Sequence, residues 1–341
     1  MALPILYRQK LRQQPQAFAL GGGAITFNLP RESVIDVIMI RLYGVVNAAA
    51  TGINIDGTPS MIASATLRGS VAGGDELQPV AGLTGADLYE LAQMQRGALP
   101  RAVGNLTTAG GIYSVCIPIY CREFFCSNEL KNLLPALPAL NMSDLTLTII
   151  PAALATVDSN SALTFTSSNI EVEVYQFYRA TLPANMQFVR GTYEVTEDNG
   201  IATSVQREVK LPSGGLYSLL GMRSYQAANV KQTDQGATAA APITYPTVGG
   251  FTLYDLSQFV KAKTSFQQLR DDNLNQIVDN LVVGNAFFGF NRTGEAGFFQ
   301  TGDIGNALNN VTVQYDATAA AGSRVRFVYR RLFDPANLFG L

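Results

Sequence analysis

The sequence predicts an all-β protein with a few helices, built as two similar β-sandwiches in tandem. The first observation behind this prediction is an internal match between Leu29–Tyr43 and Leu211–Tyr225, which needs no gap at a constant offset (29 to 211). Both segments begin with Leu-Pro, continue with four apolar residues at the same positions, and end with Arg-x-Tyr. Self-similarity at a fixed spacing indicates repeated structural units.

The ends of the two halves also match, which is the second observation. Leu145–Ile149 precedes a predicted strand that closes in Tyr-Arg at 178–179. Val311–Tyr315 precedes a predicted strand that closes in Tyr-Arg at 329–330. Because the order is the same at both ends of both halves, we expect one β-domain in each half.

The third observation is a series of short stretches rich in β-branched and aromatic residues, bounded by Gly, Pro, Asn and Asp. In the first half they predict strands at residues 24–29, 34–46, 61–69, 112–120, 144–150, 162–167 and 170–179. This spacing is typical of a β-sandwich.

Three amphipathic segments between the strands predict helices. One covers residues 86–97, where Leu88 and Leu91 share a face and Pro100 follows. The others cover residues 122–134 and 264–283, and each precedes the closing strands of its half.

These patterns divide the chain into four parts. We expect an N-terminal arm at 1–21, a first domain at 22–180, a connector at 181–198, and a second domain with a C-terminal tail at 199–341. The arm carries Arg8, Lys10 and Arg12, four glutamines and no acidic residue, and a run of three glycines at 21–23 separates it from the rest of the chain. Because glycines interrupt regular structure, the arm is predicted to be separable from the fold.

The composition favours large protein interfaces and argues against nucleic-acid binding. Of 341 residues, 15% are charged and 47% are hydrophobic, with a formal net charge of -2. Nucleic-acid binding requires a concentrated basic face, so no specific nucleic-acid binding is expected. The chain begins without the basic-then-apolar order of a signal peptide, which predicts a soluble product made in the cytoplasm.

The sequence offers little catalytic chemistry. It contains no histidine, which excludes Ser-His-Asp triads and imidazole metal ligands. Cys116, Cys121 and Cys126 recur at five-residue intervals without a fourth ligand, and we interpret them as packing residues rather than as a zinc site. We expect no catalytic residue, no metal and no cofactor.

Two pairs of acidic residues are candidates for sites. Asp271 and Asp272 are adjacent on a predicted helix and point in different directions, so a solvated face is favoured over a glycosidase pair. Glu171 and Glu173 alternate with valines, which places both on the outer side of a strand. Solvent is their expected environment, and pairing with a basic neighbour across an interface is the alternative.

In its organisation the sequence resembles the double jelly-roll major capsid proteins. These proteins build tailless icosahedral viruses, especially bacteriophages with an internal membrane, and they include the adenovirus hexon. The most specific part runs from the Pro-containing strand Tyr113–Tyr120, through the helix Arg122–Leu134, to the strand Leu145–Ile149. The resemblance covers roughly residues 22–333 and implies that both domains are jelly-roll sandwiches.

The resemblance also implies a structural protein of the virion that is not an enzyme and is made and assembled in the host cytoplasm. Three copies would form a pseudo-hexagonal homotrimer, which would contact neighbouring capsomers, penton proteins and minor capsid proteins in an icosahedral shell over an internal membrane. Arg8, Lys10 and Arg12 of the arm would face that membrane or the lattice. The alternative for the arm is a disordered, solubilising tail.

Two other functions fit a β-rich chain. A carbohydrate- or receptor-binding β-sandwich, such as a virion spike or a lectin-like protein, would have a saturable ligand and no need to form shells. A glycoside hydrolase on a jelly-roll fold would need two carboxylates and would lose turnover when one is replaced.

Overall fold

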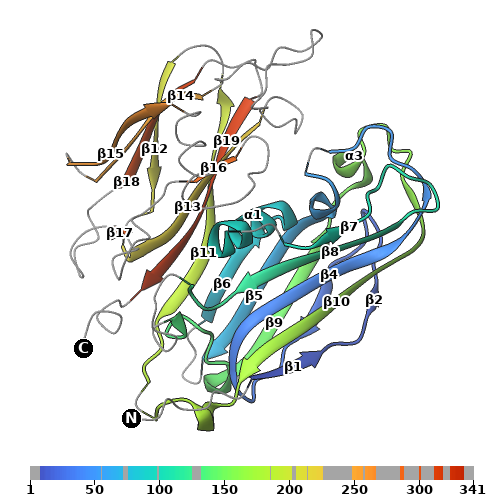
Figure 1. The fold of residues 1–341 in the computed structure, drawn as a ribbon, viewed down its shortest axis with the longest axis horizontal. Helices are drawn as coiled ribbons and strands as arrows, with labels where there is room; N and C mark the ends of the chain where they lie inside the picture. Colours follow the sequence, from blue (N-terminus) through green and yellow to red (C-terminus); the bar gives the residue numbers. More distant parts are fainter. Residues whose placement is uncertain are drawn as a thin grey trace. The chain divides into compact units, whose positions relative to one another are not determined.

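The chain folds into two compact units, with the main boundary between Tyr193 and Glu194 (Figure 1). The computed structural model describes residues 8–54, 56–71, 76–97, 100–124, 132–184, 186–201, 205–212, 214–225, 248–255, 258–265, 285–287, 299–300, 311–317 and 323–333. Strand β11 (Arg190–Ile201) carries the chain across the boundary.

The first unit is a sandwich of two sheets (Figure 1). One sheet has the order β1 (Arg8–Arg12), β10 (Thr164–Phe177), β4 (Val34–Ala48), β8 (Ile112–Tyr120), β7 (Ala102–Val103), and β2 (Gln16–Ala17) also pairs with β10. The other has the order β3 (Ile25–Asn28), β9 (Met142–Pro151), β5 (Ile62–Val71), β6 (Glu76–Leu83). All of these neighbours pair antiparallel.

Alternation along the strands places the core of this unit between its two sheets. Tyr113, Val115 and Ile117 of β8 are buried, as are Leu147 and Ile149 of β9. Since side chains two positions apart in a strand point to the same face, each strand contributes every second side chain to the core. The side chains between them lie on the outer faces of the two sheets.

Helix α1 (Gly85–Arg96) has clear start and stop signals. The Asp87 amide donates to the Thr84 hydroxyl at 3.1 Å, and the Thr84 amide donates to the Asp87 carboxylate at 2.9 Å, which is a reciprocal cap. Gly97 follows with a φ of 76°, a left-handed conformation that ends helices and suits glycine. No helix within the described ranges is long and apolar enough to cross a membrane.

The other helical elements that the structure describes in the first unit are short. They are η1 (Thr58–Met61), η2 (Ala139–Asn141), α3 (Leu154–Val157) and η3 (Arg179–Thr181).

The second unit also contains two sheets. One has the order β11, β19 (Ser323–Phe333), β13 (Leu216–Tyr225), β16 (Asn285–Phe287), and β17 (Phe299–Gln300) also pairs with β13. The other has the order β12 (Val205–Leu211), β18 (Val311–Ala317), β14 (Val248–Asp255), β15 (Gln258–Ser265).

The two units share one topology. The order β1-β10-β4-β8 recurs as β11-β19-β13-β16, and β3-β9-β5-β6 recurs as β12-β18-β14-β15. The register is kept too. Val34 of β4 lies opposite Phe177, and Leu216, which is related to Val34 by the offset of the sequence repeat, lies opposite Leu332. The internal match in the sequence therefore marks equivalent strands.

The strands expected at 24–29, 34–46, 61–69, 112–120 and 144–150 correspond to β3, β4, β5, β8 and β9, and the helix expected at 86–97 corresponds to α1. The stretches at 162–167 and 170–179 form the single strand β10, and β6 was not predicted. Most of the helix expected at 122–134 (125–131) and of the one at 264–283 (266–283) lies outside the described residues.

The expected equivalence of the two Tyr-Arg pairs was wrong in detail. Tyr178 follows β10, and Arg179 begins η3. By register, the counterpart of Leu332 is Phe177, so the pair at 329–330 corresponds to positions inside β10. Short pairs of common β-residues match by chance more readily than a long segment at a constant offset does.

Two segments that the sequence assigned to an arm and to a connector contribute strands. Arg8–Arg12 forms β1 on the edge of β10, and Arg190–Ile201 forms β11 next to β19. The first residues of these strands are again related by the offset of the repeat (8 to 190). The arm is therefore not separable over Arg8–Arg12. Its alternating charged residues indicated a solvated arm, but they form an edge strand.

Candidate functional site

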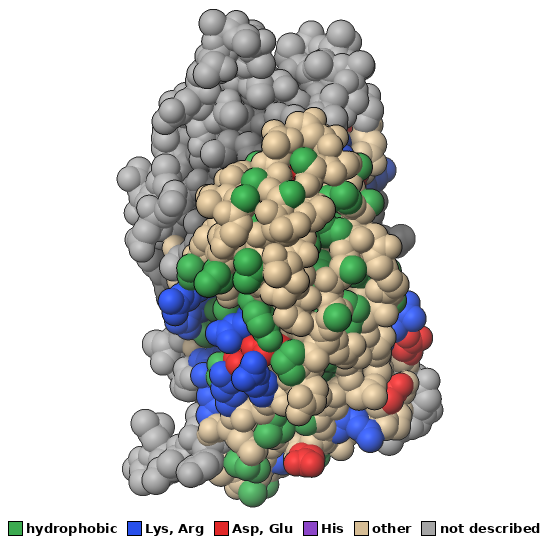
Figure 2. Space-filling model, turned by 90° about the vertical axis from the view of Figure 1, so that its right-hand side faces the viewer, with side chains coloured by type: hydrophobic (Ala, Val, Ile, Leu, Met, Phe, Trp, Pro, Cys, Tyr) green, Lys and Arg blue, Asp and Glu red, His purple; other side chains and the backbone are tan. Residues whose placement is uncertain are grey.

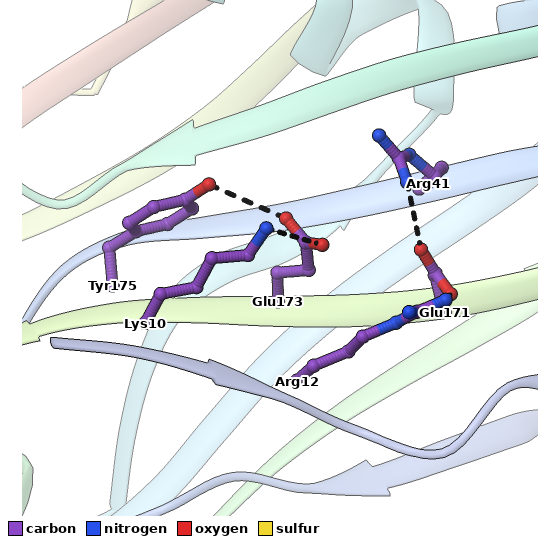
Figure 3. A network of polar contacts seen from close by, with 6 residues as sticks. All are labelled: Lys10, Arg12, Arg41, Glu171, Glu173 and Tyr175. Carbon is purple, nitrogen blue, oxygen red and sulfur yellow. Dashed lines mark hydrogen bonds and ion pairs between the residues drawn. The ribbon is translucent and has the colours of Figure 1, made fainter.

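A network of charged side chains lies on the outer face of the first unit, where β1 pairs with β10. In the antiparallel register Arg12 lies opposite Glu173, Lys10 opposite Tyr175 and Arg8 opposite Phe177. Because Arg8, Lys10 and Arg12 occupy alternate positions, their side chains project from one face of the strand. Figure 3 shows Lys10 and Arg12 reaching from β1 toward acidic side chains of β10.

Glu171 is the centre of this network. Its side chain has no exposed surface, and it binds two guanidinium groups. Arg12 donates through Nε at 3.0 Å and also through Nη2 to Oε2, and Arg41 of β4 donates through Nη1 to Oε1 at 3.2 Å (Figure 3). A buried carboxylate needs such partners, because the loss of water is costly for an ion.

Glu173, two residues further along β10, pairs with a different cation. The Lys10 ammonium lies 2.7 Å from its Oε1, and the Tyr175 hydroxyl donates to Oε2 at 3.4 Å. The hydrogen bond to Glu173 raises the pKa of Lys10 above its usual value, with burial acting against it. The ammonium also lies 5.7 Å from the centre of the Tyr175 ring, within cation–π range.

Asp36 of β4 is the third buried carboxylate. Arg8 approaches it to 2.6 Å and Arg122 to 3.6 Å. The Arg8 guanidinium also covers the Tyr175 ring at 4.6 Å from its centre. The three cations of β1 therefore all pair with carboxylates contributed by other strands of the same sheet.

Burial within the network is uneven. The Asp36 and Glu171 side chains are fully buried, whereas those of Arg8, Lys10 and Arg12 keep 45%, 48% and 56% of their surface exposed. Strand β1 thus acts as a partly exposed cationic cover over buried anions. The buried carboxylates have lost their water, so they depend on these cations to compensate their charge. Removal of strand β1 would take away this compensation and expose the carboxylates.

The network carries an excess of positive charge. It contains the basic residues Arg8, Lys10, Arg12, Arg41 and Arg122 and the acidic residues Asp36, Glu171 and Glu173. Figure 2, which views the face that is on the right in Figure 1, shows basic side chains gathered around acidic ones on a surface that is otherwise largely uncharged.

The equivalent strand pair of the second unit is also joined by ion pairs, with the signs exchanged. Glu194 of β11 accepts from Arg331 of β19 at 2.7 Å. Glu197 of β11 accepts from Arg326 at 2.5 Å and lies 3.9 Å from Arg324. Here the edge strand is acidic and the closing strand β19 is basic.

Asp198, at the same end of β11, ties this strand to the second sheet of its unit. It pairs with Arg207 of β12 and accepts a hydrogen bond from the Tyr315 hydroxyl at 2.6 Å. Burial opposes ionisation of Asp198, but the hydrogen bonds from Arg207 and Tyr315 outweigh it and lower the pKa of the carboxyl.

Comparison with known proteins identifies the architecture. No family model matches the sequence, and no curated protein matches it. Solved structures do match. The MCP of STIV, the Sulfolobus turreted icosahedral virus, superposes with a TM-score of 0.66 at 16% identity, covering 97% of this chain and 97% of that one.

Two further structures agree. The PBCV-1 virus capsid model has a TM-score of 0.66 at 12% identity, over 97% of this chain and 94% of that one. The major capsid protein P2 from bacteriophage PM2 has a TM-score of 0.60 at 12% identity, over 96% and 98%. This chain has the double jelly-roll fold. Its first and second units are the first and second jelly rolls.

The double jelly roll brings the predicted basic residues together but changes their setting. Arg8, Lys10 and Arg12 lie side by side on β1, paired within the chain. Glu171 and Glu173 do lie on the outer side of β10, but the expectation of solvent was wrong, because β1 covers them. Sequence reasoning missed Asp36 and Arg41, although a carboxylate among apolar strand residues could have marked Asp36.

The other candidate residues do not form a site where the structure describes them. Cys121 is buried and Cys116 is partly buried, both without a disulfide, while Cys126, Asp271 and Asp272 lie outside the described residues. Within the part of the chain that the structure describes, no group of three or more His, Cys, Asp or Glu side chains is placed to hold a metal.

Proposed function

We propose that this chain is the major capsid protein of an icosahedral virus, a structural component of the virion without enzymatic activity. The observation that carries the proposal is the match of both jelly rolls, in tandem and over nearly the full length of each chain, to capsid proteins of three viruses. Tandem jelly rolls with one topology present similar side faces twice, which suits repeated lateral contacts in a shell.

The finer proposal concerns assembly. Three copies around a threefold axis place six similar jelly rolls in a ring, which approximates a hexagon and fills a lattice with one kind of subunit. A pseudo-hexagonal homotrimer is therefore the proposed capsomer. Its outer faces would contact neighbouring capsomers, and penton and minor capsid proteins would fill the remaining positions.

Electron microscopy of the purified chain tests this assembly. We expect particles of hexagonal outline with a threefold axis, because the two jelly rolls are similar but not identical. Monomeric particles that bind glycans saturably on an array would contradict the proposal and support a carbohydrate- or receptor-binding protein.

We further propose that the cationic cover formed by Arg8, Lys10 and Arg12 faces the lattice or an internal membrane. The exposed halves of these side chains and the excess positive charge of the network support this orientation. Basic residues near an anionic bilayer contribute about 1 kcal/mol each to binding.

Vesicle flotation tests the membrane part of this proposal. The chain should bind vesicles that contain phosphatidylglycerol more than vesicles of phosphatidylcholine alone, and K10Q/R12Q should reduce that binding. R68Q is the matched control, because Arg68 is an exposed cation of β5 paired with the exposed Glu76. Equal vesicle binding by the natural chain, K10Q/R12Q and R68Q would contradict the proposal that the cationic cover faces a membrane.

A further inference from the structure

The duplicated fold creates a problem of strand choice. Strands β10 and β19 close equivalent sheets, and each has an edge that accepts one further strand. Strands β1 and β11 both have the same place in that topology. An open strand edge offers hydrogen bonds to any extended segment, so backbone pairing alone does not distinguish them.

The charges of the four strands do distinguish them. Strand β1 carries three basic residues and no acidic one, and β10 carries two glutamates and no basic residue. Strand β11 carries three acidic residues and one arginine, and β19 carries four arginines and no acidic residue. Each correct pair is therefore basic with acidic, and each exchanged pair would bring like charges together.

The inversion is centred on equivalent positions. Arg41 of β4 lies opposite Glu171 in the register. Arg223 of β13, which the offset of the repeat relates to Arg41, lies opposite Arg326. Glu171 and Arg326 are thus counterparts of opposite charge. Each binds an edge-strand residue of the sign that complements it, Arg12 in one case and Glu197 in the other.

We propose that this inverted charge pattern selects the edge strand of each jelly roll. The edge of β10 is a binding surface for a strand with cations at alternate positions, and β19 is one for an acidic strand. The selection operates within a chain and between neighbouring copies, where the same four strands are present. It does not depend on the capsid function, and its failure would leave that proposal intact.

The physical basis is the cost of a wrong pair. If β11 paired with β10, its acids would meet Glu171 and Glu173, whose carboxylates are buried. Like charges opposite one another on neighbouring strands destabilise a sheet, and the low dielectric of a buried site increases the effect. The rejection of the wrong strand thus adds to the attraction of the right one.

A disulfide reporter in the full chain tests the selection. Gln9 and Gln176 are register partners on β1 and β10, and their amides lie 3.4 Å apart, so Q9C/Q176C reports this pairing. The reporter is combined with three charge sets: the neutral K10Q/R12Q, the reversed K10E/R12E, and the doubly reversed K10E/R12E/E171R/E173K. After refolding under oxidation, non-reducing gel electrophoresis separates single chains from cross-linked ones, and peptide mapping of the single-chain fraction measures the 9–176 link within one chain.

The neutral and reversed variants separate selection from simple stabilisation. We expect the link to fall about threefold in the neutral variant and about tenfold or more in the reversed one, since like charges repel. The loss in the reversed variant should shrink when salt is raised, because half-exposed charges are screened. Equal loss in the two variants, or no loss in either, would overturn the proposal.

The doubly reversed variant gives the decisive contrast, because it copies the pattern of the second jelly roll into the first. Attraction between β1 and β10 is restored, but β10 now has the same sign as β19 and also attracts β11. We expect recovered linkage in chains that fold correctly, together with a lower yield of such chains and more links between chains. Full recovery of both linkage and yield would show that the inversion has no selective role.

Discussion

The two jelly rolls fasten their edge strands with the same kind of ion pair but exchange the signs. In the first, half-exposed cations of β1 cover fully buried carboxylates. In the second, arginines of β19 that are mostly buried meet partly exposed acids of β11, as in the pair of Arg326 with Glu197. Topology is therefore conserved between the repeats while the electrostatics are not, and the two properties can be varied separately.

The largest expected effect concerns the equivalent arginines. Arg223 is buried, with 1% of its surface exposed, whereas the Arg41 side chain is 41% exposed. Arg223→Ala should lower the free energy of unfolding by about 3 kcal/mol, because truncating a buried side chain leaves a cavity and removes the contact of its guanidinium with the Tyr225 ring. Arg41→Ala should cost less, about 1 to 2 kcal/mol, because the Arg41 side chain is 41% exposed and Arg12 still binds the buried Glu171 in the variant. Urea unfolding of both variants measures the difference. Equal losses of unfolding free energy would show that the difference in burial between the two arginines does not affect stability.

A smaller difference is expected at the carboxylates. Glu171 is fully buried and binds two arginines, whereas Glu197 is 24% exposed. Glu171→Gln should cost about 2 kcal/mol and Glu197→Gln about 1 kcal/mol, since charge-assisted hydrogen bonds to a buried acceptor are worth more. Thermal unfolding of the two variants in parallel is the measurement. A greater loss for Glu197→Gln would reverse the proposed order.

Acid should weaken both jelly rolls by different routes. In the first, burial opposes ionisation of Asp158, but backbone hydrogen bonds, including those from Gly52 and Leu163, outweigh it and lower its pKa. In the second, the pKa of Asp198 is also lowered. A lowered pKa contributes stability that is complete above the unfolded value of 3.8 and is lost as the pH falls through the folded value.

The urea midpoint of the natural chain should therefore drop below about pH 4. Asp158→Asn and Asp198→Asn should each be less stable at pH 6 and should show a shallower drop. Urea titrations from pH 6 to pH 3 provide the check. Parallel pH profiles for the natural chain and both variants would contradict the assignment.

The smallest expected effect is alkaline and similar in the two jelly rolls. Burial raises the pKa of Tyr113 to about 12, with a hydrogen bond to Ser168 acting against it, and burial raises that of Tyr329 to about 12. A raised pKa contributes stability that is complete below the unfolded value of 10.0 and is lost as the pH rises toward 12. In ultraviolet titrations, Tyr113→Phe and Tyr329→Phe should each lose one late-titrating phenol. Loss of an early phenol instead would show that the ring is exposed.

The sequence predicted the buried strands better than the edge strands. The stretch at 112–120 matches β8 at both ends, because its alternate apolar residues fill the core. Strand β1 resembles a solvated arm in sequence. Its charged residues alternate with one polar and one apolar residue, so it has no hydrophobic face. Nothing local distinguishes such a strand from a solvated tail, since its partners Asp36 and Glu171 are distant in the sequence.

The same limit applies to the network itself. The spacing and sign of Arg8, Lys10 and Arg12 identify them as a group, but their pairing depends on the register between β1 and β10. That register is set by backbone pairing between the two ends of the first jelly roll's sequence, which no local pattern records. The constant offset of the repeat is an indirect signal, because it also relates Arg8 to the start of β11.

We propose that three copies of this chain, each with two jelly rolls, build one capsomer. The solution mass of the purified full chain, measured by light scattering across a range of concentrations, tests it most directly. With a chain mass of 36.6 kDa, a trimer predicts a value three times larger that persists on dilution, as closed symmetry requires. A stable mass of one chain at every concentration would contradict the claim.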